Sequence, residues 1–163
     1  MILKGIVDED FINYKKPNMF ILFPYCTFKC NKDCGEDVCQ NKSLYDSPSI
    51  DVDYDYIVNR YLKNDISKAI VFGGLEPLDS KEDMINLIKC FRNRKCKDNI
   101  VIYTGYTEEE VQEMGLIDEL KNYNPIIIKY GRYIPGQKSY TDRLLGVKLA
   151  GKNQYAKSLK ESS

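Results

Sequence analysis

Residues 69–74 read Ala69-Ile-Val-Phe-Gly-Gly74, a short apolar run that stops at a pair of glycines. Comparable runs lie at residues 19–25, 99–103 and 126–129. A short continuous apolar run bounded by turn residues is typical of a strand that is buried on both faces of its sheet. These runs therefore predict the strands of one buried sheet.

The segments between the runs carry the spacing of amphipathic helices. Apolar residues recur at helical spacing in residues 54–62, which predicts a first helix. Ser80, with Asp83 three residues later, marks the start of a second helix. Thr107 and Glu110 form a capping-box pattern, which predicts a third helix from there through about residue 121.

Strands that alternate with helices predict the α/β class, with a parallel sheet and helical crossovers. Right-handed crossovers would place the helices in one outer layer, as in an open or closed barrel. A doubly wound flat sheet is the alternative, and periodicity does not separate the two.

Special residues directly follow three of the predicted strands. A cysteine-rich segment begins at Cys26, Gly73 and Gly74 end the second run, and Thr104-Gly105 follows the third. The carboxyl ends of parallel strands share one edge of a sheet, where ligands bind in such folds. We therefore expect these three segments to meet in one site.

Length and composition narrow the class of protein. The 163 residues predict a single domain over 1–163. The 24 basic residues balance the 24 acidic ones, so neither a nucleic acid nor a membrane is an expected partner. No apolar run is long enough to span a bilayer and no secretory signal is evident, which predicts a cytoplasmic protein. The absence of histidine excludes His-based catalysis and metal sites with His ligands.

The cysteines point to a metal centre. The chain has six cysteines, and Cys26, Cys30, Cys34 and Cys39 lie close together. In a cytosolic chain, such a cluster favours a metal or an iron–sulfur cluster over disulfides. Zinc sites usually use close pairs such as C-x2-C, whereas iron–sulfur clusters also take thiolates at wider spacing. The spacing favours iron–sulfur and leaves zinc open.

Three segments carry a resemblance to a known family: Cys26-Thr-Phe-Lys-Cys30, Phe72-Gly-Gly-Leu-Glu-Pro77 and Tyr103-Thr-Gly-Tyr106. Together they resemble the radical S-adenosylmethionine superfamily over about residues 20–154. Within it, the sequence is most similar to the activases of anaerobic, class III ribonucleotide reductase. The resemblance implies a small open (β/α) barrel of the radical S-adenosylmethionine type.

The same resemblance implies an activity. A [4Fe-4S] cluster would reductively cleave S-adenosyl-L-methionine, and a glycyl radical would be generated on the anaerobic ribonucleotide reductase as protein substrate. A flavodoxin- or ferredoxin-like protein would donate the electron.

The third cluster ligand departs from the family pattern. That pattern is C-x3-C-x2-C, and its third cysteine falls where this chain has Asp33. Val38 suits the apolar position that precedes the family's third cysteine, against the adenine, so the resemblance favours Cys39. Cys34 is the alternative. The implied cluster ligands are Cys26, Cys30 and Cys39.

The residues expected at the cofactor also follow from the resemblance. Gly73 and Gly74 would let the backbone approach the amino group of the cofactor. Glu76 would touch the cofactor or order its loop. Where related activases carry Asp-Gly-Lys-Tyr, this chain has Tyr130-Gly-Arg-Tyr133. The implied cofactor-binding residues are Val38, Gly73, Gly74, Glu76, Thr104 and Arg132, with Lys129 as an alternative to Arg132 for the carboxylate.

Two other interpretations remain open. One is another minimal radical S-adenosylmethionine enzyme that acts on a small molecule or a peptide. The other is a zinc-stabilised binding module in which all four clustered cysteines are structural. That module would leave the Gly73-Gly74 and Thr104-Gly105 segments unexplained. Cys90 and Cys96 are too few for a second cluster.

Overall fold

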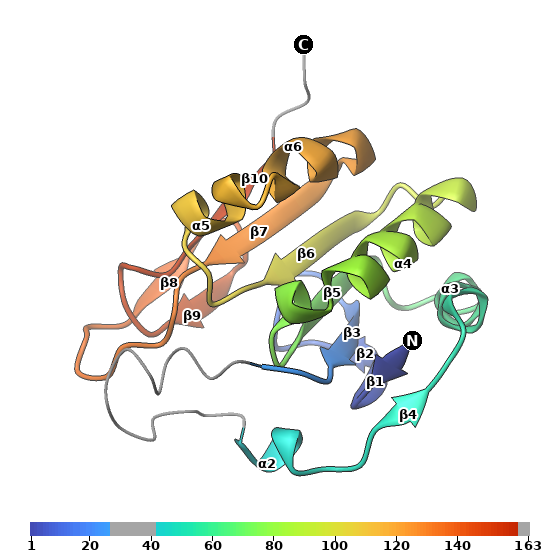
Figure 1. Cartoon of the computed structure of the whole chain (residues 1–163), viewed down its shortest axis with the longest axis horizontal. Helices are drawn as coiled ribbons and strands as arrows, with labels where there is room; N and C mark the ends of the chain where they lie inside the picture. Colours follow the sequence, from blue (N-terminus) through green and yellow to red (C-terminus); the bar gives the residue numbers. More distant parts are fainter. Residues whose placement is uncertain (27–41, 160–163) are drawn as a thin grey trace.

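The computed structural model describes residues 1–26 and 42–159 of the chain. Its centre is a six-stranded sheet with the order β10-β7-β6-β5-β3-β2 (Figure 1). The inner strands run parallel and correspond to the four apolar runs: β3 (Asn18–Phe23), β5 (Ala69–Gly74), β6 (Asn99–Tyr103) and β7 (Ile126–Tyr130). The flanking strands are antiparallel to their neighbours: β2 (Gly5–Asp10) and β10 (Tyr155–Ser158).

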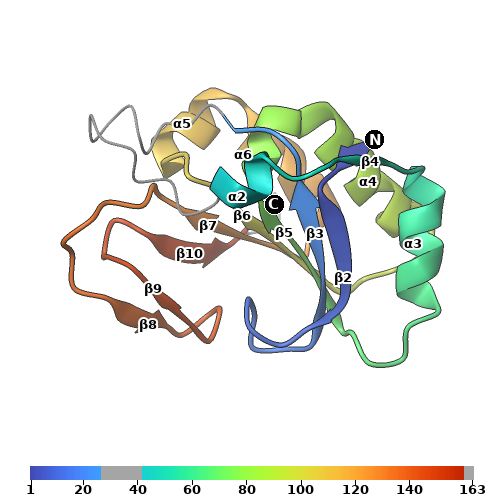
Figure 2. The same cartoon turned by 90° about the horizontal axis from the view of Figure 1, so that it is seen from below.

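The helices that connect the parallel strands pack on one face of this sheet (Figure 2). They are α3 (Tyr54–Leu62), α4 (Lys81–Asn93), α5 (Glu108–Glu113) and α6 (Leu116–Leu120). Their buried side chains share one core with alternate strand residues such as Ile21, Ile70 and Ile102. Because these connecting helices lie in a single layer, the doubly wound alternative is wrong. The sheet has two edge strands, β2 and β10, and does not close into a barrel.

The opposite face of the sheet is covered by irregular chain and a hairpin. The hairpin consists of β8 (Tyr140–Asp142) and β9 (Val147–Leu149). Tyr14, from the loop after β2, and Leu145, from the hairpin turn, pack against Val71 and Val101 in a second apolar core. The Lys15 amide donates to the Leu145 carbonyl over 2.7 Å, so the two covering segments hold each other in place.

The strand register aligns four residues in one row at the carboxyl ends of the strands, on this second face. Leu22 pairs with Gly73, and Tyr103 pairs with Lys129. The ladder between β5 and β6 ends one position earlier, at Phe72 and Ile102. The main chain at Gly73 is therefore still paired with β3 but no longer paired with β6.

The remaining elements are short. They are β1 (Ile2–Leu3) paired with β4 (Ile50–Asp51), α2 (Lys42–Tyr45), and the 3-10 helices η1 (Pro77–Ser80) and η2 (Lys121–Tyr123). The expected third helix is interrupted, because Gly115 adopts a left-handed φ of 73° between α5 and α6. Ser80 precedes α4 as expected, but its side chain makes no capping hydrogen bond. Within the described ranges, every helix is too short or too polar to cross a membrane.

Candidate functional site

A cavity of about 480 Å³ lies at the carboxyl edge of the parallel strands. Each parallel strand contributes to its lining: Cys26 follows β3, Gly74 ends β5, Thr104 follows β6 and Lys129 lies near the end of β7. This volume is in the range of small-molecule sites, about 300–1,000 Å³. Cys26, at the start of the cysteine-rich segment, thus meets the Gly73-Gly74 and Thr104-Gly105 segments at one edge, as the strand order predicts.

The floor of the cavity is the aligned row of the sheet together with Phe20. Gly73 has a packing reason to be glycine, because a Cβ there would lie 2.8 Å from the Phe20 ring. Gly74 has a conformational reason, because its φ is 78° and a Cβ would lie 2.9 Å from the Leu22 Cα. Both residues also line the cavity. Glycine is therefore required here for packing and backbone conformation, in addition to the expected close approach of a ligand.

The turn after Gly74 is hydrogen-bonded to the segment that leads into Cys26. The Leu75 amide donates to the Phe23 carbonyl over 3.2 Å, and the Glu76 amide donates to the Tyr25 carbonyl over 2.8 Å. These bonds continue the pairing of β3 with β5 beyond both strands. The first cysteine of the C-x3-C segment is therefore held beside the Gly-Gly turn.

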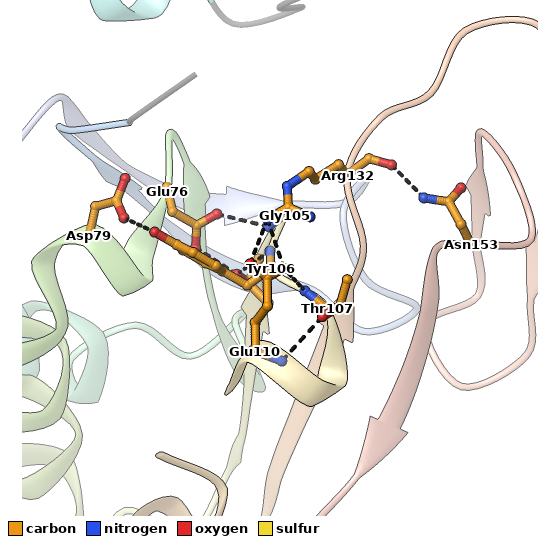
Figure 3. A network of polar contacts seen from close by, with 9 residues as sticks. Glu76, Asp79, Gly105, Tyr106, Thr107, Glu110, Arg132 and Asn153 are labelled. Carbon is orange, nitrogen blue, oxygen red and sulfur yellow. Dashed lines mark hydrogen bonds and ion pairs between the residues drawn. The ribbon is translucent and has the colours of Figure 1, made fainter. Parts of the chain in front are cut away.

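Glu76 joins the loop after β5 to the loop after β6 (Figure 3). Its Oε1 accepts a hydrogen bond from the Thr104 hydroxyl at 2.7 Å and from the Leu78 amide at 3.2 Å. Its Oε2 accepts from the Gly105 amide at 2.8 Å. The side chain is buried and also lines the cavity, so its carboxylate orders the loops and borders the space for a ligand.

Burial raises the pKa of Glu76 to about 7, although the hydrogen bonds from Gly105, Thr104 and Leu78 oppose that rise. Desolvation therefore outweighs the three donors. Near neutral pH this carboxyl exists in both protonation states.

A second connection between the two loops runs through Tyr106. Its hydroxyl donates to Asp79 at 2.6 Å, and its amide donates to the Thr104 hydroxyl oxygen at 3.0 Å (Figure 3). The Tyr106 carbonyl accepts from the Gly131 amide at 3.0 Å. The loops after β5, β6 and β7 are thus tied to one another around the cavity.

Arg132 takes part in this network rather than in the described cavity lining. Its Nη2 donates to both carboxylate oxygens of Glu110, at 2.7 and 2.8 Å. Glu110 in turn completes the expected capping box of α5 with Thr107. The Arg132 carbonyl accepts from the Asn153 side chain at 2.8 Å (Figure 3). The guanidinium therefore fastens the segment after β7 to α5.

Lys129, the alternative to Arg132, does line the cavity. Its side chain is only 7% exposed, and its Nζ donates to the Gly131 carbonyl at 2.9 Å. Gly131 itself has a φ of 102°, and a Cβ there would lie 2.3 Å from the Asn153 carbonyl oxygen. A close approach of backbone to backbone thus sets the path of the chain beyond Lys129.

Several expected residues lie outside the described part of the chain: Cys30, Cys34, Val38 and Cys39. Of the clustered cysteines, Cys26 is described, and it lines the cavity. Within the described residues, no group of three or more His, Cys, Asp or Glu side chains could hold a metal ion.

The other two cysteines lie away from the cavity. Cys90 is in the last turns of α4, where its thiol donates to Asp55 at 3.2 Å. Burial and this hydrogen bond raise the pKa of the Cys90 thiol to about 11, which disfavours the thiolate that a metal would need. Cys96 is buried just before β6, at the opposite edge of the sheet.

Two segments that line the cavity have no signal in the sequence. Asn13 comes from the loop after β2, and Lys148, Leu149 and Ala150 come from β9 and the residue after it. None of them follows a predicted strand of the sheet. Lys148, Leu149 and Ala150 reach the cavity because the hairpin folds over the second face of the sheet. Asn13 reaches it because the loop after β2 covers the same face.

Comparison with known protein families indicates which metal centre the chain holds. A family model described as a 4Fe-4S single cluster domain matches residues 18–150. The match includes the four parallel strands, the clustered cysteines and most of the cavity lining. No curated protein and no solved structure matches the chain. The chain therefore belongs to the family of 4Fe-4S single cluster domains and is an iron–sulfur protein.

Proposed function

We propose that this protein is a radical S-adenosylmethionine activase. It reductively cleaves S-adenosyl-L-methionine at a [4Fe-4S] cluster and generates a glycyl radical on an anaerobic ribonucleotide reductase. One observation carries the proposal: the first cysteine of the C-x3-C segment, the Gly-Gly turn and Thr104 line one cavity at the carboxyl edge of a parallel sheet.

On this proposal the cluster is held by Cys26, Cys30 and Cys39, with Cys34 as the alternative to Cys39. Cys26 supports the assignment, because it lies at the cavity beside the turn that carries Gly74. Three thiolates leave one iron without a protein ligand. That iron would bind S-adenosylmethionine.

The residues around the cavity fit the cofactor. S-adenosylmethionine carries an ammonium, a carboxylate, a sulfonium and an adenosine. The main-chain polar groups at Gly73 are not paired with β6, and Lys129 supplies a cation. Phe20 and Tyr103 supply aromatic surface in the same lining. When bound, the cluster and cofactor would supply the electron transfer and the hydrogen abstraction.

The chain itself would orient the cofactor and limit water. The second apolar core closes the covered face of the sheet beneath the cavity. Glu76 and Tyr106 hold the loops of β5 and β6 together at its rim. The open sheet with helices in one layer supports its assignment as a small partial barrel, whose open mouth a protein substrate would cover.

The first test is electron paramagnetic resonance of the protein, purified without oxygen, reconstituted with iron and sulfide, and reduced. A four-iron signal that changes on addition of S-adenosylmethionine is expected, because one iron is open to the cofactor. Loss of the signal in Cys39→Ala, and its retention in Cys34→Ala, would identify the third ligand. A colourless protein that holds zinc, or a cluster that is indifferent to the cofactor, would refute the proposal.

The partner is tested with an anaerobic, class III ribonucleotide reductase. Incubation of reduced protein, S-adenosylmethionine and reductase is expected to give a glycyl radical signal on the reductase. A flavodoxin or ferredoxin should replace the chemical reductant. Rapid turnover of a small metabolite without any reductase would instead favour another minimal enzyme of the superfamily.

A further inference from the structure

The part of the chain that contains the β8–β9 hairpin carries an uneven distribution of charge. Residues 131–157 contain six basic side chains and one acidic side chain, although the whole chain has equal numbers of both. The acidic residue, Asp142, is buried and accepts from the Leu145 amide at 2.9 Å. Its carboxylate is therefore not available at the surface of the hairpin.

The outer face of the hairpin is set by the alternation along its strands. Val147 and Leu149 pack against the second apolar core of the protein. Lys148 lies between them and therefore points outward, where it is exposed opposite Thr141 of β8. The middle of the outer face thus carries a positive charge.

Further cations lie at both ends of the hairpin. At the turn, the Lys15 side chain packs against Gly146, and the same turn carries Arg143. At the open end, the Gln137 side chain lies against Gly151, so the residues that follow these two, both lysines, lie near each other. We call the exposed cations of this surface the basic band: Lys15, Lys138, Arg143, Lys148 and Lys152.

The charges of the basic band are not neutralised within the described part of the chain. None of its five members forms an ion pair there, whereas Arg60, Arg132 and Lys157 have carboxylate partners. Like charges on one short hairpin repel one another, so they do not stabilise the fold. A surface of one sign instead attracts and orients a partner of the opposite sign.

The basic band also borders the site of the proposed chemistry. Lys148 lines the same cavity as Cys26, and Figure 2 shows the hairpin on the side of the sheet away from the helices. A substrate that loses a hydrogen atom must reach into the cavity. An electron donor needs only to come near it, because an electron can cross several ångströms of protein.

We propose that the basic band docks the negatively charged surface of a flavodoxin-like electron donor. In the docked pair, one electron leaves the reduced flavin and enters the oxidised cluster, and no bond forms or breaks in that step. This inference rests on the proposed function, since that function consumes the electron.

A single-stranded nucleic acid suits the basic band less well. Proteins that bind single strands combine positive charge with aromatic rings on which the bases stack. The aromatic residue of the hairpin strands, Tyr140, is half-buried, and its hydroxyl donates to the Gln154 carbonyl. The net charge of the whole chain is also zero, which is not typical of a nucleic-acid-binding protein.

The test measures the affinity of a purified flavodoxin for the anaerobic, reconstituted protein by isothermal titration at low and at high salt. The variant combines Lys138→Glu, Arg143→Glu and Lys152→Glu, and it keeps Lys148 because that residue also lines the cavity. At low salt it should bind at least about tenfold more weakly, because three attractive contacts become repulsive. The difference should shrink at high salt, where exposed charges are screened.

The matched control combines Lys81→Glu, Lys89→Glu and Lys97→Glu, which reverse as many exposed charges on α4 and the segment after it. It should lose less than about threefold in affinity, because these charges lie outside the docking surface. Reduction of the cluster by limiting reduced flavodoxin, followed by visible absorbance, should slow only in the hairpin variant. If that variant does not load a cluster, the same three positions are changed to Gln.

The outcomes separate this inference from the proposed function. Equal weakening in the hairpin variant and the control, or tighter binding of a single-stranded oligonucleotide than of flavodoxin, overturns the docking surface. Failure of the wild type to bind flavodoxin, while its cluster signal still changes with S-adenosylmethionine, overturns this inference alone. A cluster signal that is indifferent to S-adenosylmethionine overturns the proposed function and this inference together. Weaker binding in the hairpin variant alone supports it.

Discussion

The buried carboxyl of Glu76 makes the stability of this protein depend on pH in an unusual direction. Burial raises its pKa to about 7, from an ordinary value near 4.5. Between these two values the native state keeps a proton that the unfolded chain has released. The contribution of Glu76 to the free energy of unfolding is therefore fully present below pH 4.5, and this contribution is lost as the pH rises through 7.

The size of the effect follows from the shift. Each pH unit in that window contributes about 1.4 kcal/mol, and a window of about two and a half units gives roughly 3 kcal/mol in total. Between pH 5 and pH 8 the expected loss is roughly 2–3 kcal/mol, because some of the change precedes pH 5. Most carboxylates of folded proteins act in the opposite direction, since their native-state pKa is lowered.

Glu76→Gln isolates this contribution, because the amide stays neutral at every pH. The carboxylate accepts hydrogen bonds from Thr104, Gly105 and Leu78. In the variant, the NH₂ of the amide replaces one carboxylate oxygen, so one of these three donors faces another donor and loses its acceptor. An unsatisfied buried donor costs about 1–3 kcal/mol. The variant should therefore be less stable than the wild type at pH 5 and about equal to it at pH 8.

Urea unfolding at pH 5, 6, 7 and 8, followed by far-ultraviolet circular dichroism on metal-free protein, measures both curves. Glu108→Gln is the control, because hydrogen bonding to Lys157 lowers the pKa of Glu108. Its contribution is present above the unfolded-state pKa and is lost as the pH falls. A difference between wild type and Glu76→Gln that stays constant from pH 5 to pH 8 would show that burial does not dominate at Glu76.

Three further predictions concern packing and the cysteines. Gly131→Ala should destabilise the fold by about 3 kcal/mol or more, because its Cβ would lie 2.3 Å from the Asn153 carbonyl oxygen. Gly115 also has a positive φ, of 73°, but a Cβ there meets open space, so Gly115→Ala should lose only about 1–2 kcal/mol in the same urea unfolding. Arg92→Met removes the donors to four backbone carbonyls and should lower the free energy of unfolding by roughly 2–4 kcal/mol. Its affinity for S-adenosylmethionine, measured by titration, should stay unchanged, because Arg92 lies at the end of the sheet away from the cavity. Cys90→Ala should leave the iron content per chain unchanged, and a loss of iron by elemental analysis would contradict the single-cluster interpretation.

Local patterns were sufficient for the central elements. The helical spacing of residues 54–62 and the apolar run of 99–103 match α3 and β6 residue for residue. The capping box at Thr107 also forms as its pattern predicts. The length of the third helix was wrong, because a glycine at residue 115 adopts a conformation that ends the helix.

The edge strands could not be predicted from local patterns. β2 reads Gly-Ile-Val-Asp-Glu-Asp and β10 reads Tyr-Ala-Lys-Ser, and neither has a continuous apolar run. Both become strands because β3 and β7 offer them unpaired edges. The single layer of helices likewise depends on which face each connection covers, which periodicity does not encode.

The pattern of apolar runs and helical spacing predicted the succession of strands and helices, and the edge at which Cys26, the two glycines and Thr104 lie together. The cysteine spacing favoured an iron–sulfur centre, and the family match shows it. The roles of the side chains at that edge follow from the folded structure. It put Lys129 in the cavity and Arg132 against Glu110, and it gave Gly73 a packing partner in Phe20. The reason is that alternation along a strand sets the face of a side chain, whereas its partners come from segments distant in sequence, such as the hairpin that closes the second face.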